Sequence, residues 1–185
     1  DKTGTLDAKI WDPGSLGIDD FEKLDYLNVV GDVTSFQGAL QLNIKRIRKA
    51  QQGEYDPKEY LPVSRYNMDQ MYEELMRMIH RIENPYLKQL ANVFFENAKF
   101  QEAFKFHSAA KTMHHGFVGG LLQHTLGVAK LCELFAAQYD ILNRDLLVTA
   151  AVFHDVGKLK ELSRFPENDY TDAGQLLGHI IIGTQ

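Results

Sequence analysis

Residues 153–158 read Phe-His-Asp-Val-Gly-Lys and close a helix that the sequence predicts over residues 144–156, with Asn143 as its N-cap. Two stripes are predicted to face inward along this helix and to end at its histidine and its aspartate. They consist of Leu146, Ala150 and His154, and of Leu147, Ala151 and Asp155. Neighbouring residues on a helix diverge by about 100°, so the side chains of His154 and Asp155 can converge on an ion placed between them.

A third residue of the same kind lies upstream, in a helix predicted over residues 117–139. His124 shares a face with apolar residues at spacings of three and four, namely Leu121, Val128, Leu131 and Phe135. An isolated inward histidine is more often a core residue with one hydrogen bond. A buried carboxylate, however, is costly unless a cation lies beside it. We therefore predict that His124, His154 and Asp155 bind a metal ion.

Three more residues in or near this motif are predicted to have specific roles, and two of them have an alternative interpretation. Gly157 is predicted to end its helix in the left-handed conformation. Lys158 is either a solvated lysine near a helix C-terminus or a contact to a substrate phosphate. His179 lies on an apolar face of a helix predicted over residues 174–184, where it is either a further imidazole ligand or a core residue.

Helical periodicity begins well before this motif. Asn67 is predicted to cap a first helix, and Asn84-Pro85 to begin a second as N-cap and first helical residue. Residues 67–185 are therefore predicted to be all helical. Residues 51–66 are polar, contain glycine and proline and have neither period, which is typical of a linker.

Residues 1–50 have the period of β-structure instead. Leu6, Ala8 and Ile10 alternate with polar residues, and apolar alternation returns at residues 27–30 and 40–44. Gln37-Gly38 supplies turn chemistry, so residues 22–49 are predicted to form a meander of short strands. This β unit is too small to close a barrel alone.

The β unit also contains a basic run within an acidic chain. Lys45, Arg46, Arg48 and Lys49 lie in five residues, whereas the whole chain has a formal net charge of −5. A local patch of this kind can attract phosphates, and Trp11 could stack on a base. The alternative is that the aromatic residues fill a core and the basic run is a solvated edge.

Composition excludes several classes of protein. The chain has 185 residues and one cysteine, so it has no internal disulfide, and no secretory signal is evident at its start. No apolar stretch approaches the roughly 18 residues of a membrane span. These features predict a folded cytoplasmic protein with no membrane partner.

The motif at residues 153–158, together with His124, resembles the HD superfamily of metal-dependent phosphohydrolases. Residues 114–125, which read HHGFVGGLLQHT, are similar to the narrower YhaM-type 3′-5′ exoribonucleases, in which an OB-fold precedes the HD domain. The resemblance implies a mainly α protein, with an incomplete OB-fold-like nucleic-acid-binding unit over residues 1–50. Residues 67–185 would then be an HD domain whose last ligand, an aspartate, is expected beyond Gln185.

The same resemblance implies the chemistry. His124, His154, Asp155 and His179 would bind one or two divalent ions, with Asp155 and Lys158 as catalytic residues. Manganese is the favoured ion, with iron, zinc or nickel as alternatives. Single-stranded RNA, or DNA, would be the substrate, and Trp11, Lys45, Arg46, Arg48 and Lys49 would contact it. Two other functions stay open: hydrolysis of nucleotides or cyclic dinucleotides, and single-strand binding without catalysis.

Overall fold

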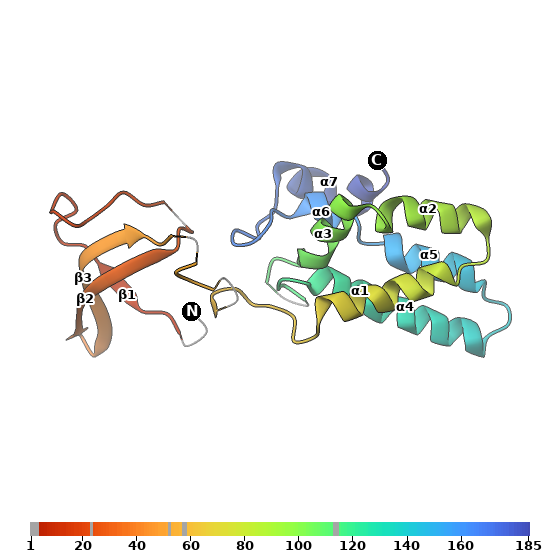
Figure 1. Ribbon diagram of the computed structural model, residues 1–185, viewed down its shortest axis with the longest axis horizontal. Helices are drawn as coiled ribbons and strands as arrows, with labels where there is room; N and C mark the ends of the chain where they lie inside the picture. The colour runs from red at the N-terminus through yellow and green to blue at the C-terminus, as the bar shows by residue number, and fades with distance from the viewer. Residues whose placement is uncertain (1–3, 23, 52, 57–58, 113–114) are drawn as a thin grey trace. The chain divides into compact units, whose positions relative to one another are not determined.

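The computed structural model describes residues 4–22, 24–51, 53–56, 59–112 and 115–185. The chain divides into two compact units, Asp1–Leu61 and Pro62–Gln185 (Figure 1). The first contains a small sheet and the second is helical, so the expected mainly α class with a β unit at the start is confirmed. Among the described helices, none combines the length and the hydropathy that crossing a membrane requires.

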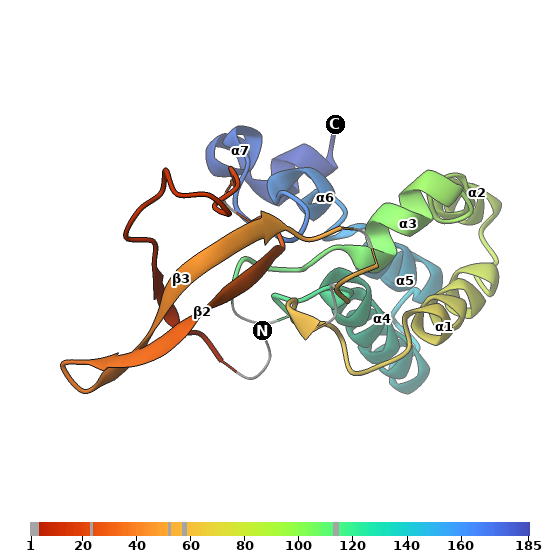
Figure 2. The same cartoon turned by 60° about the vertical axis from the view of Figure 1, so that its left-hand side comes forward.

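The sheet has three strands in the order β1-β3-β2. Its strands are β1 (Asp7–Lys9), β2 (Leu27–Phe36) and β3 (Ala39–Lys49). β2 and β3 form the long antiparallel hairpin seen in Figure 2, whereas β1 pairs with β3 in parallel. The hairpin turns at Gln37 and Gly38, whose φ angles of 50° and 82° match the two-residue turns that suit twisted strands. The predicted turn is therefore confirmed, but two long strands replace the expected meander of short ones.

The helical unit begins with the helices that the capping residues predicted. The helices are α1 (Met68–His80), α2 (Pro85–Phe95), α3 (Ala98–Phe106), α4 (Gly120–Gln138), α5 (Arg144–Phe153), α6 (Lys158–Glu161) and α7 (Asp172–Gly183). The side chains of Asn67, Asn84 and Asn143 each accept a hydrogen bond from a backbone N–H in the first turn. α3 was not predicted, because the apolar stripe of α2 continues in phase across the break that Asn97 caps.

The core lies where α1, α4 and α5 run side by side, with α2 and α3 packed against them (Figure 1). Its fully buried side chains include Leu75, Ile79, Ile82, Phe95, Phe104, Leu121, Leu122, Val148 and Val152. Burial of each such side chain contributes roughly 1.5–3 kcal/mol. This core fixes the N-terminal part of α4 and the C-terminal end of α5, which carry or adjoin three of the four predicted metal ligands, His124, His154 and Asp155.

Two of the predicted inward stripes are wrong, one of them in every member. Leu146, Ala150 and His154 are all exposed, with Leu146 at 59%, and the buried face of α5 consists of Val148, Thr149, Ala151 and Val152. A helix of ten mainly apolar residues gives periodicity too little contrast to choose its face. On α4, Leu131 and Phe135 are about half exposed, because burial among the described residues is confined to the N-terminal part of that helix.

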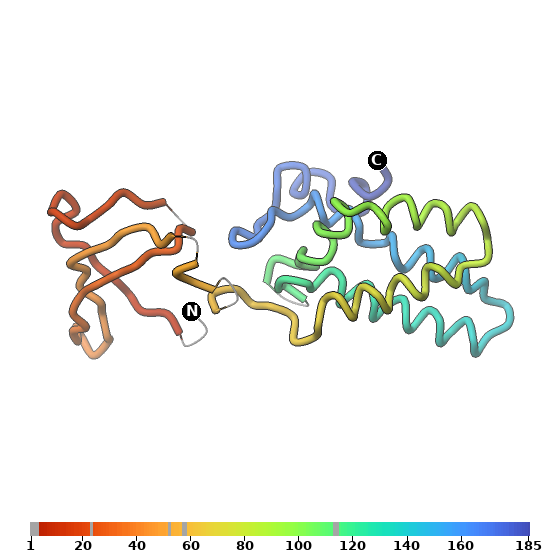
Figure 3. The backbone as a smooth tube through the Cα atoms, viewed as in Figure 1, coloured from red at the N-terminus to blue at the C-terminus, as the bar shows by residue number. Residues whose placement is uncertain are grey.

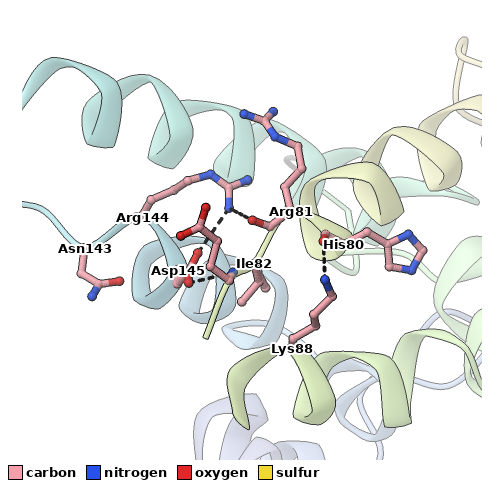
Figure 4. Close-up of a pocket in the computed structure, with 8 residues that line it drawn as sticks. His80, Arg81, Ile82, Lys88, Asn143, Arg144 and Asp145 are labelled. Atoms are coloured by element: carbon pink, nitrogen blue, oxygen red, sulfur yellow. Dashed lines mark hydrogen bonds and ion pairs between the residues drawn. The ribbon is translucent and has the colours of Figure 1, made fainter. Parts of the chain in front are cut away.

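A polar pocket lies where α1 ends and where α2 and α5 begin (Figure 4). Arg144 donates to the carbonyl groups of Met78 and Arg81 at 3.2 Å. Asp145 Oδ2 accepts from the backbone N–H groups of Glu83 and Asn84 at 2.9 and 2.7 Å. These side chains satisfy backbone groups at the two helix ends, so the pocket has a structural explanation.

Candidate metal centre

Three side chains from α4 and from the end of α5 converge on one point. His124 Nε2 lies 3.2 Å from His154 Nε2 and 3.4 Å from Asp155 Oδ2, and His154 Nε2 lies 3.3 Å from the same oxygen. Asp155 is buried, at 6% exposure, whereas His154 and His124 remain about a third exposed. The three groups could therefore hold a metal ion at a point that remains open to solvent on one side.

The donor set fits a cation. His154 Nδ1 lies 2.7 Å from the carbonyl oxygen of Ala151, an acceptor, so Nδ1 donates and Nε2 is the nitrogen that a cation would bind. With sides of 3.2 to 3.4 Å, the triangle of donor atoms places each of them about 2 Å from its centre, the distance typical of a metal–imidazole bond. Two imidazoles and one carboxylate suit manganese, iron, zinc or nickel better than magnesium or calcium.

Burial and mutual charge adjust the pKa values of the three side chains. Burial raises the pKa of Asp155, but the hydrogen bond to His154 and the nearby positive charges outweigh it, so the net pKa is lowered. Burial lowers the pKa of His124, and the hydrogen bond to Asp155 raises that of His154. An ionised carboxylate and a neutral His124 are the forms in which these groups bind a cation.

His179 reaches this cluster from α7. Its Nε2 lies 3.3 Å from Asp155 Oδ1, the carboxylate oxygen that faces away from the two other histidines. Its Nδ1 lies 2.9 Å from Glu161 Oε1, on α6. The structure therefore brings His179 to Asp155, with a carboxylate beside each ring nitrogen. The described group whose ligand atoms all lie within 4.8 Å of one another consists of His124, His154 and Asp155 and does not include His179.

Lys158 lies on α6 and points toward the same cluster of charges. Its Nζ donates to Glu161 Oε2 at 3.3 Å, and its side chain is only 15% exposed. It is thus not an ordinary solvated lysine. Glu161 itself was missed by the sequence analysis, although its spacing of three residues from Lys158 is the one at which opposite charges pair on a helix.

Gly157 does not adopt the predicted left-handed conformation. Its φ and ψ of −60° and −20° are those of a right-handed helix. The need for glycine comes instead from a close approach, because a Cβ atom here would lie 2.0 Å from the carbonyl oxygen of His179. Figure 3 traces the backbone from α5 through α6 into α7. α6 and α7 pack against each other, and Gly157 lies where α6 begins.

Two consecutive histidines, His114 and His115, precede α4. His114 lies outside the described residues. The ring of His115 lies with its centroid 5.4 Å from that of His124 and 5.6 Å from that of Phe117. The His115 ring therefore lies beside that of His124, at the edge of the group formed by His124, His154 and Asp155.

On the sheet, Trp11 is presented to solvent. It is 73% exposed, and its Nε1 donates to Asn43 Oδ1 at 3.0 Å. The ammonium group of Lys9 lies 5.4 Å from the Trp11 ring centroid and 5.5 Å from that of Phe36, which is also exposed. Trp11 and Phe36 are therefore not core residues of the described sheet. Tyr26, in contrast, stacks on Tyr55 at 3.9 Å.

Three of the four residues in the basic run form ion pairs within the β unit. Their pairs are Lys45 with Asp32 at 2.5 Å, Arg48 with Glu54 at 2.8 Å and Lys49 with Asp25 at 2.8 Å. Arg46 is exposed and has no ion pair among the described residues. The run is thus largely neutralised, and its attraction for phosphate is smaller than the sequence alone indicates.

Comparison with known proteins agrees with the geometry of the helical unit. Residues 121–185 match the family model described as HD domain, and this segment contains all four predicted ligands. Over 98% of its length, the chain is 32% identical to the 3′-5′ exoribonuclease YhaM of Geobacillus sp. (strain WCH70) and 33% identical to that of Listeria innocua. The identity to the protein of the same name from Bacillus subtilis (strain 168) is 32%.

The chain spans 56–58% of the length of these relatives. No solved structure matches it. The expected resemblance to the HD superfamily and to YhaM-type exoribonucleases is therefore confirmed by sequence.

Proposed function

We propose that this chain carries the catalytic centre of a metal-dependent phosphodiester hydrolase that shortens single-stranded RNA from its 3′ end. The observation that supports it is the convergence of His124, His154 and Asp155 within 3.2 to 3.4 Å of one another. The direction of hydrolysis and the RNA substrate are inferred from the names of the relatives. The cytoplasm is the proposed location, which the one free cysteine, Cys132, supports.

Each of these residues has a distinct role in the proposed hydrolysis. When bound, a divalent cation, manganese being the favoured one, supplies an activated water and polarises a phosphoryl oxygen. His124, His154 and Asp155 would hold that cation, and His179 would lie beside it, with its Nε2 3.3 Å from Asp155 Oδ1. Lys158 adds a positive charge beside the site, where it opposes the negative charge that develops on the phosphate.

An assay with a 5′-labelled single-stranded oligoribonucleotide tests the proposal. With Mn²⁺ we expect a ladder of progressively shorter labelled products, and with a chelator we expect intact RNA. The same strand in deoxyribose form measures the preference for RNA. Hydrolysis of nucleotides or cyclic dinucleotides without shortening of the RNA would contradict the proposal in favour of a nucleotide hydrolase. RNA binding with no metal-dependent hydrolysis of any substrate would indicate a regulator.

The sheet is proposed to bind the same strand, with Trp11 as the main stacking residue. Trp11 is the one tryptophan of the chain, so its fluorescence reports on its own surroundings. In chelator, which prevents hydrolysis, titration with oligouridylate is expected to quench this fluorescence. Trp11→Ala is expected to weaken binding of labelled RNA about tenfold, because stacking of one base contributes about 1–3 kcal/mol.

The matched control for this prediction is Tyr86→Ala. Tyr86 is 81% exposed on α2, in the other unit, and its removal is expected to leave the affinity for RNA unchanged. Fluorescence that stays constant at saturating RNA would exclude Trp11 from the contact. In that case Arg46, the unpaired member of the basic run, would be the next residue to replace.

A further inference from the structure

Glu161 is a buried carboxylate that the proposed chemistry does not use. It is 6% exposed and belongs to the short helix α6. Its Oε1 accepts from both the backbone N–H and the Nδ1 of His179, at 2.9 Å each, and its Oε2 accepts from Lys158. A carboxylate is costly to bury unless its oxygens are satisfied in this way, and two of the three donors come from one residue.

The backbone of α7 is interrupted to make this contact. Gly178 has φ 71° and ψ 161°, a conformation that side-chain-bearing residues rarely adopt. The break releases the N–H of His179 from the helical pattern, and this N–H donates to Glu161. The helix is therefore interrupted at Gly178, directly before the residue that contacts Glu161.

This contact determines which nitrogen of His179 faces the metal-binding cluster. With Nδ1 donating its proton to Glu161, the other nitrogen, Nε2, is directed at Asp155 Oδ1 at 3.3 Å. A carboxylate that accepts from the far nitrogen of an imidazole fixes the ring and raises its basicity as a ligand. The burial of Asp155 and Glu161 keeps water from competing for these contacts.

We propose that Glu161 is a positioning residue of the metal centre, which holds the His179 imidazole with Nε2 directed at Asp155 Oδ1, beside the cation. The inference rests on the proposed metal centre. It assigns Glu161 no contact with the cation or with the substrate. Its effect on metal binding passes through His179.

Metal affinity measured by calorimetry with Mn²⁺ alone tests this role. In the full chain, Glu161→Ala is expected to weaken Mn²⁺ binding about 10–100-fold, the effect typical of losing a partner that orients a ligand. Glu161→Gln retains an oxygen that can accept from His179 and is expected to lose less. In a His179→Ala background, Glu161→Gln is expected to cause no further loss.

The matched control is Glu96→Gln. Glu96 also pairs with a histidine, His80, at 3.2 Å, but this pair is exposed. Its substitution is expected to leave Mn²⁺ affinity unchanged.

Wild-type affinity in both Glu161 variants would overturn the inference, as would an equal loss for Glu161→Gln with and without His179. If Glu161→Ala fails to fold, the Glu161→Gln and His179→Ala cycle decides alone, and wild-type Mn²⁺ affinity in Glu161→Gln then overturns the inference. Because Mn²⁺ affinity is measured without RNA, a chain with Glu161-dependent binding but no hydrolysis would refute only the proposed function.

Discussion

Asparagine in place of Asp155 is expected to lower Mn²⁺ affinity and RNA hydrolysis by roughly a hundred- to a thousandfold. Asp155 is the one carboxylate of the cluster, and its two oxygens face His124 and His154 on one side and His179 on the other. Asparagine keeps the shape but removes the negative charge that offsets the charge of a cation. Loss of one partner from a buried charge pair costs about 3–5 kcal/mol, which corresponds to this range or more.

The comparison variant is Asp140→Asn, since Asp140 is an exposed residue between α4 and α5. It is expected to bind Mn²⁺ and to hydrolyse RNA like the wild type. Calorimetry with Mn²⁺ and the rate of shortening of a labelled strand are the two measurements. If Asp155→Asn binds Mn²⁺ as tightly as the wild type, then the ion is held elsewhere and the proposed centre is wrong.

Local signals in the sequence were sufficient to place most of the helices. Asn67, Asn84 and Asn143 each cap a helix as predicted, because a cap depends on residues within one turn of each other. The face that α5 buries was not predictable in the same way. Its sequence is apolar on nearly every side, so the neighbouring helices choose the face, and only Ala151 and Asp155 of the predicted stripes are buried.

The sequence predicted which residues form the candidate site, but it did not predict the contacts among them. The motif at residues 153–158 indicated two of the candidate ligands, His154 and Asp155, whereas the Glu161–His179 contact joins residues 18 apart in the sequence. The ion pairs that neutralise the basic run have a similar origin. Lys45 meets Asp32 at the point where the pairing of β2 with β3 is irregular, between Val30 and Gly31. The turn at Gln37-Gly38 fixes the register near it but does not indicate this irregularity.

Alanine in place of Gly157 is expected to destabilise the chain by about 3 kcal/mol and to weaken Mn²⁺ binding together with it. The added Cβ atom would lie 2.0 Å from the carbonyl oxygen of His179 and 2.8 Å from the backbone nitrogen of Gly183. Both neighbours are backbone atoms, so no side-chain rotation relieves the clash and α7 must move. Overpacking costs typically 1–3 kcal/mol, and a backbone clash belongs at the upper end.

Gly127→Ala separates this effect from the ordinary consequence of replacing a glycine. Gly127 lies in α4, and a Cβ atom there would have nothing within 4 Å. Its replacement is expected to stabilise the helix by about 0.5–1 kcal/mol. Denaturant unfolding of both variants, with and without Mn²⁺, is the measurement. Since His179 moves with α7, a Gly157→Ala chain with wild-type stability and Mn²⁺ affinity would show that the packing of α7 does not place His179 at the metal.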